Sequence, residues 1–175
     1  MKYFVGIDLG GTNIKAGIVN EFGEILNKKS VKTNAERGME DIVSDMGHLA
    51  IEVIAEAGLS QLDIEAIGIG SPGTPDNKTG YLVYSNNLPF NMTPMRSMIR
   101  KKIDLPVYID NDANCAAMAE SVAGAAKGVA DSVTITLGTG IGCGVIINRR
   151  IYFGFNQAGS EFGHTVLVAG GEPCT

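Results

Sequence analysis

Three consecutive polar residues, Asp110, Asn111 and Asp112, follow an apolar run and precede an alanine-rich segment. Capping of a following helix by Asn111 or Asp112 would explain one of them, but not all three. In a phosphotransferase, a carboxylate at this position accepts the proton of an attacking hydroxyl, and the neighbouring amide orients the substrate. The helix N-terminus would also help to keep the carboxylate ionised. The stretch is therefore a candidate catalytic site.

Two glycine-rich turns of one design lie far apart in the chain, within IDLGGTNIKAGIV (7–19) and ITLGTGIGCGVII (135–147). Glycine lets backbone N–H groups approach phosphate oxygens closely. In the first turn, Asp8 could hold Mg²⁺ through water, Thr12 offers a hydroxyl and Lys15 offers a positive charge. Neither turn is a Walker A motif. The repetition predicts two related domains that each begin with a phosphate-binding turn; the alternative is coincidence between ordinary hairpins.

The stretch GIGSPG (68–73) matches the spacing of the dinucleotide-binding fingerprint G-x-G-x-x-G. That fingerprint requires a helix to begin at its third glycine, because the helix N-terminus binds the pyrophosphate. Here the turn-forming sequence TPDNKTG follows instead. We therefore predict a loop whose backbone can approach a small ligand.

A histidine and a cysteine lie close to the end of the sequence. Glu161 precedes His164 by three positions, and Cys174 follows. A zinc site normally takes four ligands, and His164 and Cys174 supply only two, so the indication of a metal site is weak. The other histidine, His48, lies off the apolar stripe of its predicted helix and is interpreted as solvated.

The spacing of apolar residues predicts an α/β chain with a mixed sheet and crossover connections. A meander of three strands opens it, and a helix with an apolar stripe follows, closed by Gly58 as C-cap. The predicted strands are 3–9, 14–20, 24–33, 64–70, 106–112, 132–137 and 144–153; the predicted helices are 38–58, 94–102 and 113–126; a loop or hairpin is predicted over 71–80.

Composition narrows the classes of protein. Of 175 residues, 45% are hydrophobic and 19% are charged, and the net charge is -5, which argues against disorder and against a general nucleic-acid or membrane surface. Neither a signal peptide nor a membrane-spanning segment is predicted, so a cytoplasmic protein is expected. The three cysteines, Cys115, Cys143 and Cys174, form no disulfide framework and are expected to be reduced.

Six ordered motifs together resemble the N-terminal part of a ROK-family sugar kinase, most closely those of bacterial glucokinases. They are DLGGTNIKAGIV, GIGSPG, NNL (86–88), DNDANCAA, LGTGIGCGVI and QAGSEFGH with the approach to Cys174. The resemblance implies an actin-like (ribonuclease H-like) ATPase fold of two lobes, with residues 1–112 forming the first lobe and 113–175 beginning an incomplete second lobe. It also implies phosphorylation of a hexose by ATP, with glucose favoured over fructose, N-acetylmannosamine or allose.

The resemblance assigns a role to each matching position. Asp112 becomes the general base, and the sugar pocket takes Gly73, Asn86 or Asn87, Asn111, Glu161 and His164. The ATP phosphates lie between two turns, one formed by Asp8, Gly10, Gly11, Thr12, Asn13 and Lys15, and the other by Gly138, Thr139, Gly140 and Gly142. Mg²⁺ accompanies ATP. Structural Zn²⁺ takes His164, Cys174 and two further cysteines beyond residue 175, so this chain is expected to bind zinc weakly and to have little kinase activity.

Two other classes of protein share the fold. ROK transcriptional repressors use it to sense sugars, carry a winged helix-turn-helix before the first glycine turn and often lose the phosphate-binding residues, which are intact here. Chaperone- or filament-type ATPases would not need the EFGH and cysteine elements. A kinase is therefore favoured, with a homodimer expected for the full-length protein, no nucleic-acid partner, and polyphosphate left open as an alternative donor.

Overall fold

The computed structural model describes residues 1–138, 140–155, 157 and 159–171. The chain divides into two compact units, Met1–Cys115 and Ala116–Thr175. The division falls inside helix α3 (Asp112–Ala123), whose first residue is also where the sequence placed the end of the first lobe. The functional roles given to the two lobes remain a prediction.

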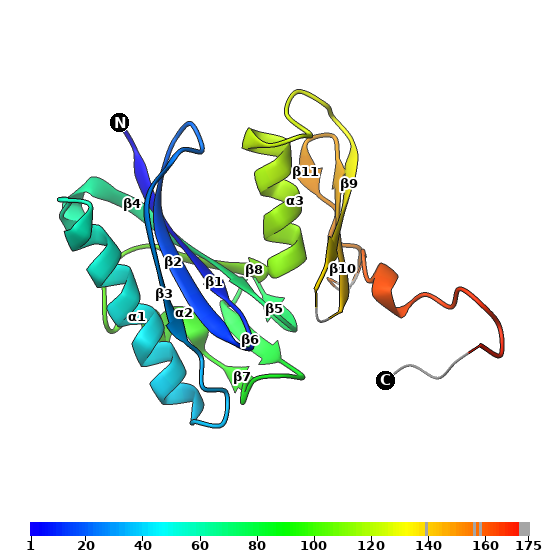
Figure 1. The fold of residues 1–175 in the computed structure, drawn as a ribbon, viewed down its shortest axis with the longest axis horizontal. Coiled ribbons are helices and arrows are strands. Elements are labelled where there is room, and N and C mark those ends of the chain that lie inside the picture. Colours follow the sequence, from blue (N-terminus) through cyan, green and yellow to red (C-terminus); the bar gives the residue numbers. More distant parts are fainter. Residues whose placement is uncertain (139, 156, 158, 172–175) are drawn as a thin grey trace. The chain divides into compact units, whose positions relative to one another are not determined.

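The first unit is built on a five-stranded mixed sheet (Figure 1). Its strand order is β3-β2-β1-β4-β8. The antiparallel strands β1, β2 and β3 form the predicted meander, and β4 and β8 continue the sheet parallel to β1. The bounds are β1 (Tyr3–Leu9), β2 (Asn13–Asn20), β3 (Ile25–Lys32), β4 (Ile64–Ser71) and β8 (Val107–Asn111). The predicted mixed sheet with crossovers is confirmed for this unit.

Alternation along the central strand β1 separates a core face from an open face. Val5, Ile7 and Leu9 are buried, whereas Gly6 and Asp8 are exposed. Successive side chains of a strand point to opposite faces, so the apolar alternation buries one face and leaves Asp8 on the other. Strand β1 therefore carries Asp8 on the face opposite the core.

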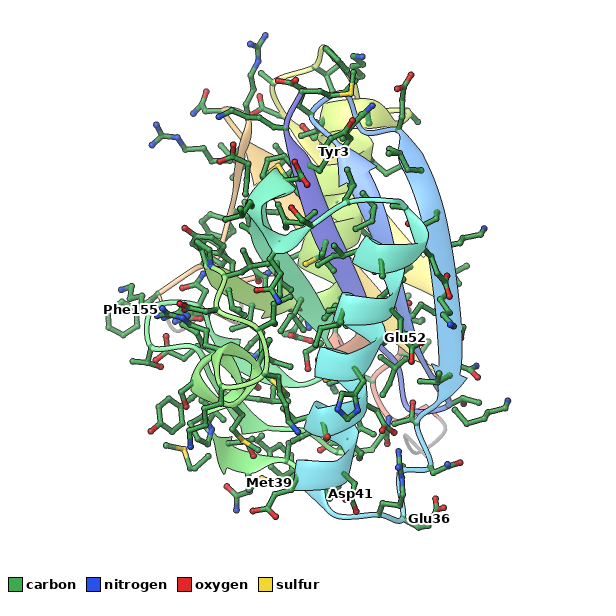
Figure 2. The ribbon with its side chains drawn as sticks, turned by 90° about the vertical axis from the view of Figure 1, so that its left-hand side faces the viewer. Tyr3, Glu36, Met39, Asp41, Glu52 and Phe155 are labelled. Carbon is green, nitrogen blue, oxygen red and sulfur yellow. The ribbon has the colours of Figure 1, made fainter. Side chains whose placement is uncertain are left out.

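Helix α1 (Met39–Glu56) packs against β1, β2 and β3 (Figure 2, in which Met39 marks its first residue and Glu52 its last turns). The predicted apolar stripe is buried, and His48 is exposed as expected. Gly58 has φ +70°, and the Leu59 N–H donates to the Ile54 carbonyl, which is the bonding of a helix C-cap with glycine in the left-handed region. No helix in the described part of the chain is long and apolar enough to cross a bilayer.

A second, three-stranded sheet lies between β4 and β8 in the sequence. Its order is β5-β6-β7, from Thr74–Asp76, Tyr81–Tyr84 and Asn91–Thr93. The hairpin of β5 and β6 confirms the prediction for 71–80, and β7 was not predicted. Helix α2 (Met95–Arg100) then leads to β8, and a 3₁₀ turn, η1 (Gln61–Asp63), precedes β4.

The described residues of the second unit form a three-stranded antiparallel sheet of order β11-β10-β9. The bounds are β9 (Ser132–Leu137), β10 (Ile141–Ile147) and β11 (Arg150–Ile151), followed by a 3₁₀ turn, η2 (Phe162–His164). The prediction of one strand over 144–153 was wrong, because Asn148 and Arg149 have φ of 52° and 61° and turn the chain back. The helix predicted to residue 126 ends at Ala123 instead, and the Ala125 N–H donates to the Glu120 carboxylate.

Candidate active site

The carboxyl ends of the parallel strands β1, β4 and β8 bring candidate residues to one edge of the first sheet. Asp8 is in register with Gly70, and Gly70 is in register with Asp110. Residues in register on neighbouring strands point to the same face, here the one opposite the core. In open α/β sheets, ligands bind outside the carboxyl ends of the strands, so this edge is the natural position for a site.

Lys15 extends the same row onto β2. It lies opposite Asp8 across the antiparallel pair, and its Nζ is 3.1 Å from Asp8 Oδ2. Both side chains are more than half exposed, so the ion pair is worth little in stability. An exposed carboxylate fits Mg²⁺, which is bound by carboxylate oxygens and waters, and a lysine beside it fits a phosphate. Asp8 and Lys15 therefore suit an Mg²⁺-nucleotide.

The backbone amides of the two glycines in the first turn differ in their hydrogen bonding. The Gly10 N–H donates to the Asn13 carbonyl at 3.0 Å, closing the turn, so this amide is not available to a phosphate. The assignment of Gly10 to the phosphate-binding turn remains a prediction, in which Gly10 shapes the turn. The Gly11 N–H makes no hydrogen bond within the residues that the structure describes. Thr33, which the sequence did not indicate, binds the carbonyls of both Gly10 and Thr12.

The three polar residues at the end of β8 have separate roles. The Asp110 carboxylate accepts the Asn111 N–H and the Asn114 side-chain amide. Asn111 Oδ1 accepts the N–H groups of Ala113 and Asn114, so Asn111 caps α3 as the capping alternative predicted. Asp112 is exposed at the first position of α3, and its Oδ1 accepts the Ala113 N–H. Only Asp112 presents an exposed carboxylate at the helix N-terminus.

Asn111 also holds the loop that contains Gly73. Asn111 Nδ2 donates to the Gly73 carbonyl at 3.3 Å, and the second N–H of this amide has no partner among the residues that the structure describes. Gly73 has φ +86°, and a Cβ at this position would overlap the Tyr84 carbonyl oxygen. Glycine is therefore required here, and it lets the loop after β4 pass close to the segment that follows β6.

The segment after β6 carries the two candidate asparagines. Asn86 and Asn87 are both exposed and lie between β6 and β7. A Cβ placed on Gly11 would be 3.9 Å from Asn87 Cβ, so the first glycine turn lies in contact distance of this segment. The first unit thus brings the glycine turn and the asparagine segment together, although they are separated by most of its sequence.

Cys115, in the first turns of α3, reports on the charge at this edge. Burial, followed by the carboxylates of Asp110, Asp112 and Asp8, raises the pKa of its thiol to about 12. Its side chain lies 3.5 Å from the Cβ position of Gly70. Because its thiol stays protonated, Cys115 serves as a packing residue. The three carboxylates make the electrostatic potential around it negative.

The second unit holds the other candidate residues. Gly138 and Gly140 lie in the turn between β9 and β10, where the Gly138 N–H donates to the Gly140 carbonyl, and Gly142 lies near the start of β10. Thr139 and Cys174 lie outside the described residues. Glu161 and His164 are exposed at the two sides of η2, and Gly163 approaches the Ile141 carbonyl so closely that a Cβ would overlap it. Glu161 and His164 therefore lie near the second glycine turn.

The described residues do not form a zinc site. His164 Nε2 is 4.0 Å from Glu161 Oε2, and both side chains are more than half exposed. Over the ranges that the structure describes, no three histidine, cysteine or acidic side chains are grouped to bind a metal. A zinc site needs about four ligands, so His164 alone does not fit one.

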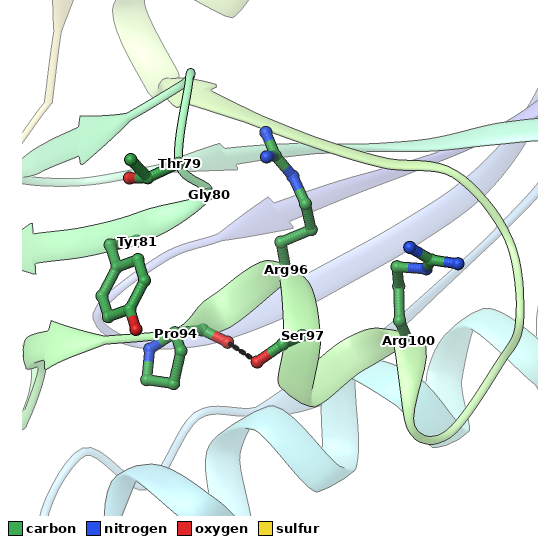
Figure 3. Close-up of a pocket in the computed structure, with 7 residues that line it drawn as sticks. All are labelled: Thr79, Gly80, Tyr81, Pro94, Arg96, Ser97 and Arg100. Carbon is green, nitrogen blue, oxygen red and sulfur yellow. Dashed lines mark hydrogen bonds between the residues drawn. The ribbon is translucent and has the colours of Figure 1, made fainter.

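A shallow pocket of about 180 Å³ lies elsewhere in the first unit, between the β5–β6 hairpin and α2 (Figure 3). None of the candidate site residues lines it. Arg96, at its centre, donates to the carbonyls of Asn77, Lys78 and Val107, so its guanidinium is occupied in joining the hairpin to β8. The pocket is therefore a by-product of a structural arginine.

Comparison with known proteins agrees with this arrangement. The model of the ROK family matches residues 4–175. A glucokinase of Halalkalibacterium halodurans is 36% identical over 174 residues, which are 99% of this chain and 53% of that protein. A xylose repressor of Bacillus subtilis is 33% identical over 175 residues, 99% of this chain and 44% of the repressor.

Among solved structures, a ROK family glucokinase from Streptomyces griseus in complex with glucose and AMPPNP superimposes with a TM-score of 0.85 and 36% identity. The match covers 95% of this chain and 51% of that one. The predicted actin-like α/β fold is confirmed. The chain spans about half the length of the curated relatives it matches. By the family model, the sequence identity and the fold, the chain belongs to the ROK family.

Proposed function

We propose that the full-length protein is an ATP-dependent hexose kinase, with glucose as its first candidate substrate and Asp112 as its general base. The observation that carries the proposal is the exposed Asp112 carboxylate at the N-terminus of α3, beside a row formed by Asp8 and Asp110. The similarity to glucokinases, one of them solved with glucose and AMPPNP, supports the same activity.

In this proposal, Asp112 accepts the proton of a sugar hydroxyl as the hydroxyl oxygen attacks the γ-phosphorus of ATP. The new oxygen–phosphorus bond forms while the bond to the β-phosphate oxygen breaks, and ADP leaves. The helix N-terminus favours the ionised form of Asp112 beforehand. The remaining N–H of Asn111 orients the sugar, and the Gly73 loop and Asn86 or Asn87 complete the pocket in the first unit.

The phosphate chain of ATP is assigned to the two glycine turns. In the first turn, the Gly11 N–H and the Lys15 ammonium supply donors, and Thr12 adds a hydroxyl. Phosphoryl transfer depends mostly on positioning and charge stabilisation, so these groups act by holding the γ-phosphate in line with the hydroxyl. Mg²⁺, when bound with ATP, neutralises phosphate charge next to Asp8. Glu161 and His164 of the second unit are proposed to contact sugar hydroxyls.

The decisive experiment measures sugar phosphorylation by the full-length protein with glucose, fructose, N-acetylmannosamine and allose, using ATP and, in parallel, polyphosphate as donor. Asp112→Asn should lower turnover by roughly 10²- to 10⁴-fold or more while ATP binding is largely retained, because only proton transfer is removed. Asp104→Asn is the matched control, since Asp104 is an exposed acid before the opposite end of β8. Near-normal turnover of Asp112→Asn would rule out this base.

A sugar-sensing transcriptional regulator is the second candidate, because the xylose repressor of Bacillus subtilis matches the same residues. The intact Asp8–Lys15 pair favours the kinase, since a sensor has no need of phosphate-binding groups. A protein that binds a sugar but transfers no phosphate from either donor would support the regulator instead. Light scattering on the same preparation tests the proposed homodimer.

A further inference from the structure

Thr33 is a fully buried polar residue placed directly after β3. Its hydroxyl donates to the Gly10 carbonyl at 2.6 Å, and its N–H donates to the Thr12 carbonyl at 3.0 Å. One residue thus binds both sides of the turn that contains Gly11. No local pattern in the sequence marks Thr33, because its partners are more than twenty positions away.

The bond from Thr33 fixes the direction of one peptide plane. A trans peptide is planar, so the carbonyl of one residue and the N–H of the next point in opposite directions. With the Gly10 carbonyl turned toward Thr33, the Gly11 N–H is turned away from it. Glycines have little intrinsic preference for either orientation, so the Gly10–Gly11 peptide needs an external contact to hold it.

Thr33 is itself held in place. Its carbonyl accepts Arg37 Nη2 at 2.9 Å, and the same nitrogen is 2.6 Å from Asp45 Oδ2 on α1. Arg37 is about 30% exposed, so this contact is partly shielded from water. The connection between β3 and α1 is therefore tied to the helix, and Thr33 offers a fixed reference point for the turn.

We propose that Thr33 is a positioning residue for phosphate binding. It holds the Gly10–Gly11 peptide in the orientation in which the Gly11 N–H faces the bound phosphate. The inference rests on the proposed function, since it needs the turn to bind ATP. Thr33 itself touches neither ATP nor the sugar, and it acts through the backbone of the turn.

The test uses the full-length protein and three substitutions. Thr33→Val replaces the hydroxyl by a methyl group, Thr33→Ala removes both, and Thr33→Ser keeps the hydroxyl. Thr93→Val is the matched control, because Thr93 is equally buried in the same unit and, within the described part of the chain, its hydroxyl bonds only the sulfur of Met39. The measurements are the dissociation constant of AMPPNP, KM for ATP and KM for the sugar.

Loss of the hydroxyl should weaken AMPPNP binding and raise KM for ATP by roughly tenfold, since the partly buried Gly10 carbonyl loses its donor and the peptide can rotate. KM for the sugar should change less than twofold. Thr33→Ser should restore ATP binding, and Thr93→Val should alter neither KM. If Thr33→Val does not fold, Thr33→Ala gives the same comparison without placing a methyl group against the Gly10 carbonyl.

Unchanged KM for ATP in a folded Thr33→Val or Thr33→Ala protein would overturn the inference while leaving the kinase intact. Equal rises in both KM values would also overturn it, since they indicate a general loss of structure. An unmodified protein that binds no AMPPNP and phosphorylates no sugar would instead overturn the proposed function, and the inference with it. The unmodified protein is therefore measured first.

Discussion

The hairpin of β1 and β2 and the hairpin of β9 and β10 share one sequence design but differ in how far neighbouring elements bury them. Leu9 and Leu137 occupy the same position, directly before the glycine turn, yet Leu9 is 0% exposed and Leu137 is 80% exposed. β1 lies in the middle of a five-stranded sheet with α1 packed on it. β9 is an edge strand in the order given by the described residues.

In both hairpins the local pattern encodes the strand pairing, whereas burial depends on the neighbouring elements. Both stretches pair as antiparallel strands, as the alternation of apolar residues and the glycines require. The apolar side chains of β9 (Val133, Ile135, Leu137) are all exposed, whereas those of β1 that face α1 are buried. The same pattern thus makes a hairpin in both places, and only the surrounding elements turn it into a core.

The largest difference is expected from truncation of the paired leucines. Leu9→Ala should lower the free energy of unfolding of its unit by about 2–5 kcal/mol, because it leaves a cavity in a packed core. Leu137→Ala should change it by less than about 0.5 kcal/mol, as for an exposed position. Native-state hydrogen exchange of β1 and β9 amides measures each unit separately. Equal losses in the two variants would show that the two hairpins are supported alike.

The paired glycines should differ by a smaller amount. A Cβ on Gly10 would lie 2.9 Å from the Asn13 carbonyl oxygen, whereas a Cβ on Gly138 meets nothing within 4 Å. Gly10→Ala should therefore cost roughly 1–3 kcal/mol, because backbone atoms must move, and Gly138→Ala should cost less than about 1 kcal/mol. The same exchange measurement tests both. A larger effect at Gly138 would contradict the difference in packing.

The thiol pKa values of Cys115 and Cys143 predict how the stability of each unit depends on pH. The pKa of Cys115 is raised to about 12, and that of Cys143 is raised mainly by burial and then by Glu161. Between an unfolded pKa near 8.5 and the folded value, the folded state holds the proton and the unfolded state releases it, so stability falls as pH rises. The first unit should lose on the order of 1 kcal/mol between pH 8 and 9.5.

Urea unfolding at several pH values measures this loss. Cys115→Ala is the control, in which the free energy of unfolding should depend much less on pH. A slope that persists in Cys115→Ala would assign the effect to another group. Native-state alkylation at pH 8 gives an independent check, since the protonated thiol of Cys115 should react far more slowly than a cysteine in the unfolded chain.

Much of the fold was predictable because it follows from short-range periodicity. The meander, the stripe of α1 and the C-cap at Gly58 each follow from spacing within a few residues, and all are confirmed. The errors lie where one side chain or turn overrides the pattern. Asn148 and Arg149 divide a predicted strand, and α3 ends before the predicted residue.

The candidate site was predictable in its residue types but not in its connections. Asp8, Asn111 and Asp112 stood out because strand ends and a helix start favour polar groups there. The separate roles of the polar residues at the end of β8 could not be predicted, because capping by Asn111 and hydrogen bonding by Asp110 depend on which neighbours fold onto them. Thr33 could not be found at all, because its only signal is a contact between distant segments.

By itself, the sequence determined the two glycine hairpins, the polar end of β8 and the family resemblance, because each depends on residues that are close together in the chain. The tertiary structure alone decided that Asp8, Gly70 and Asp110 stand in one row, that the Gly10 amide closes its turn and that Thr33 holds that turn. The physical reason is that strand register and side-chain reach across strands join positions whose distance along the chain carries no local signal.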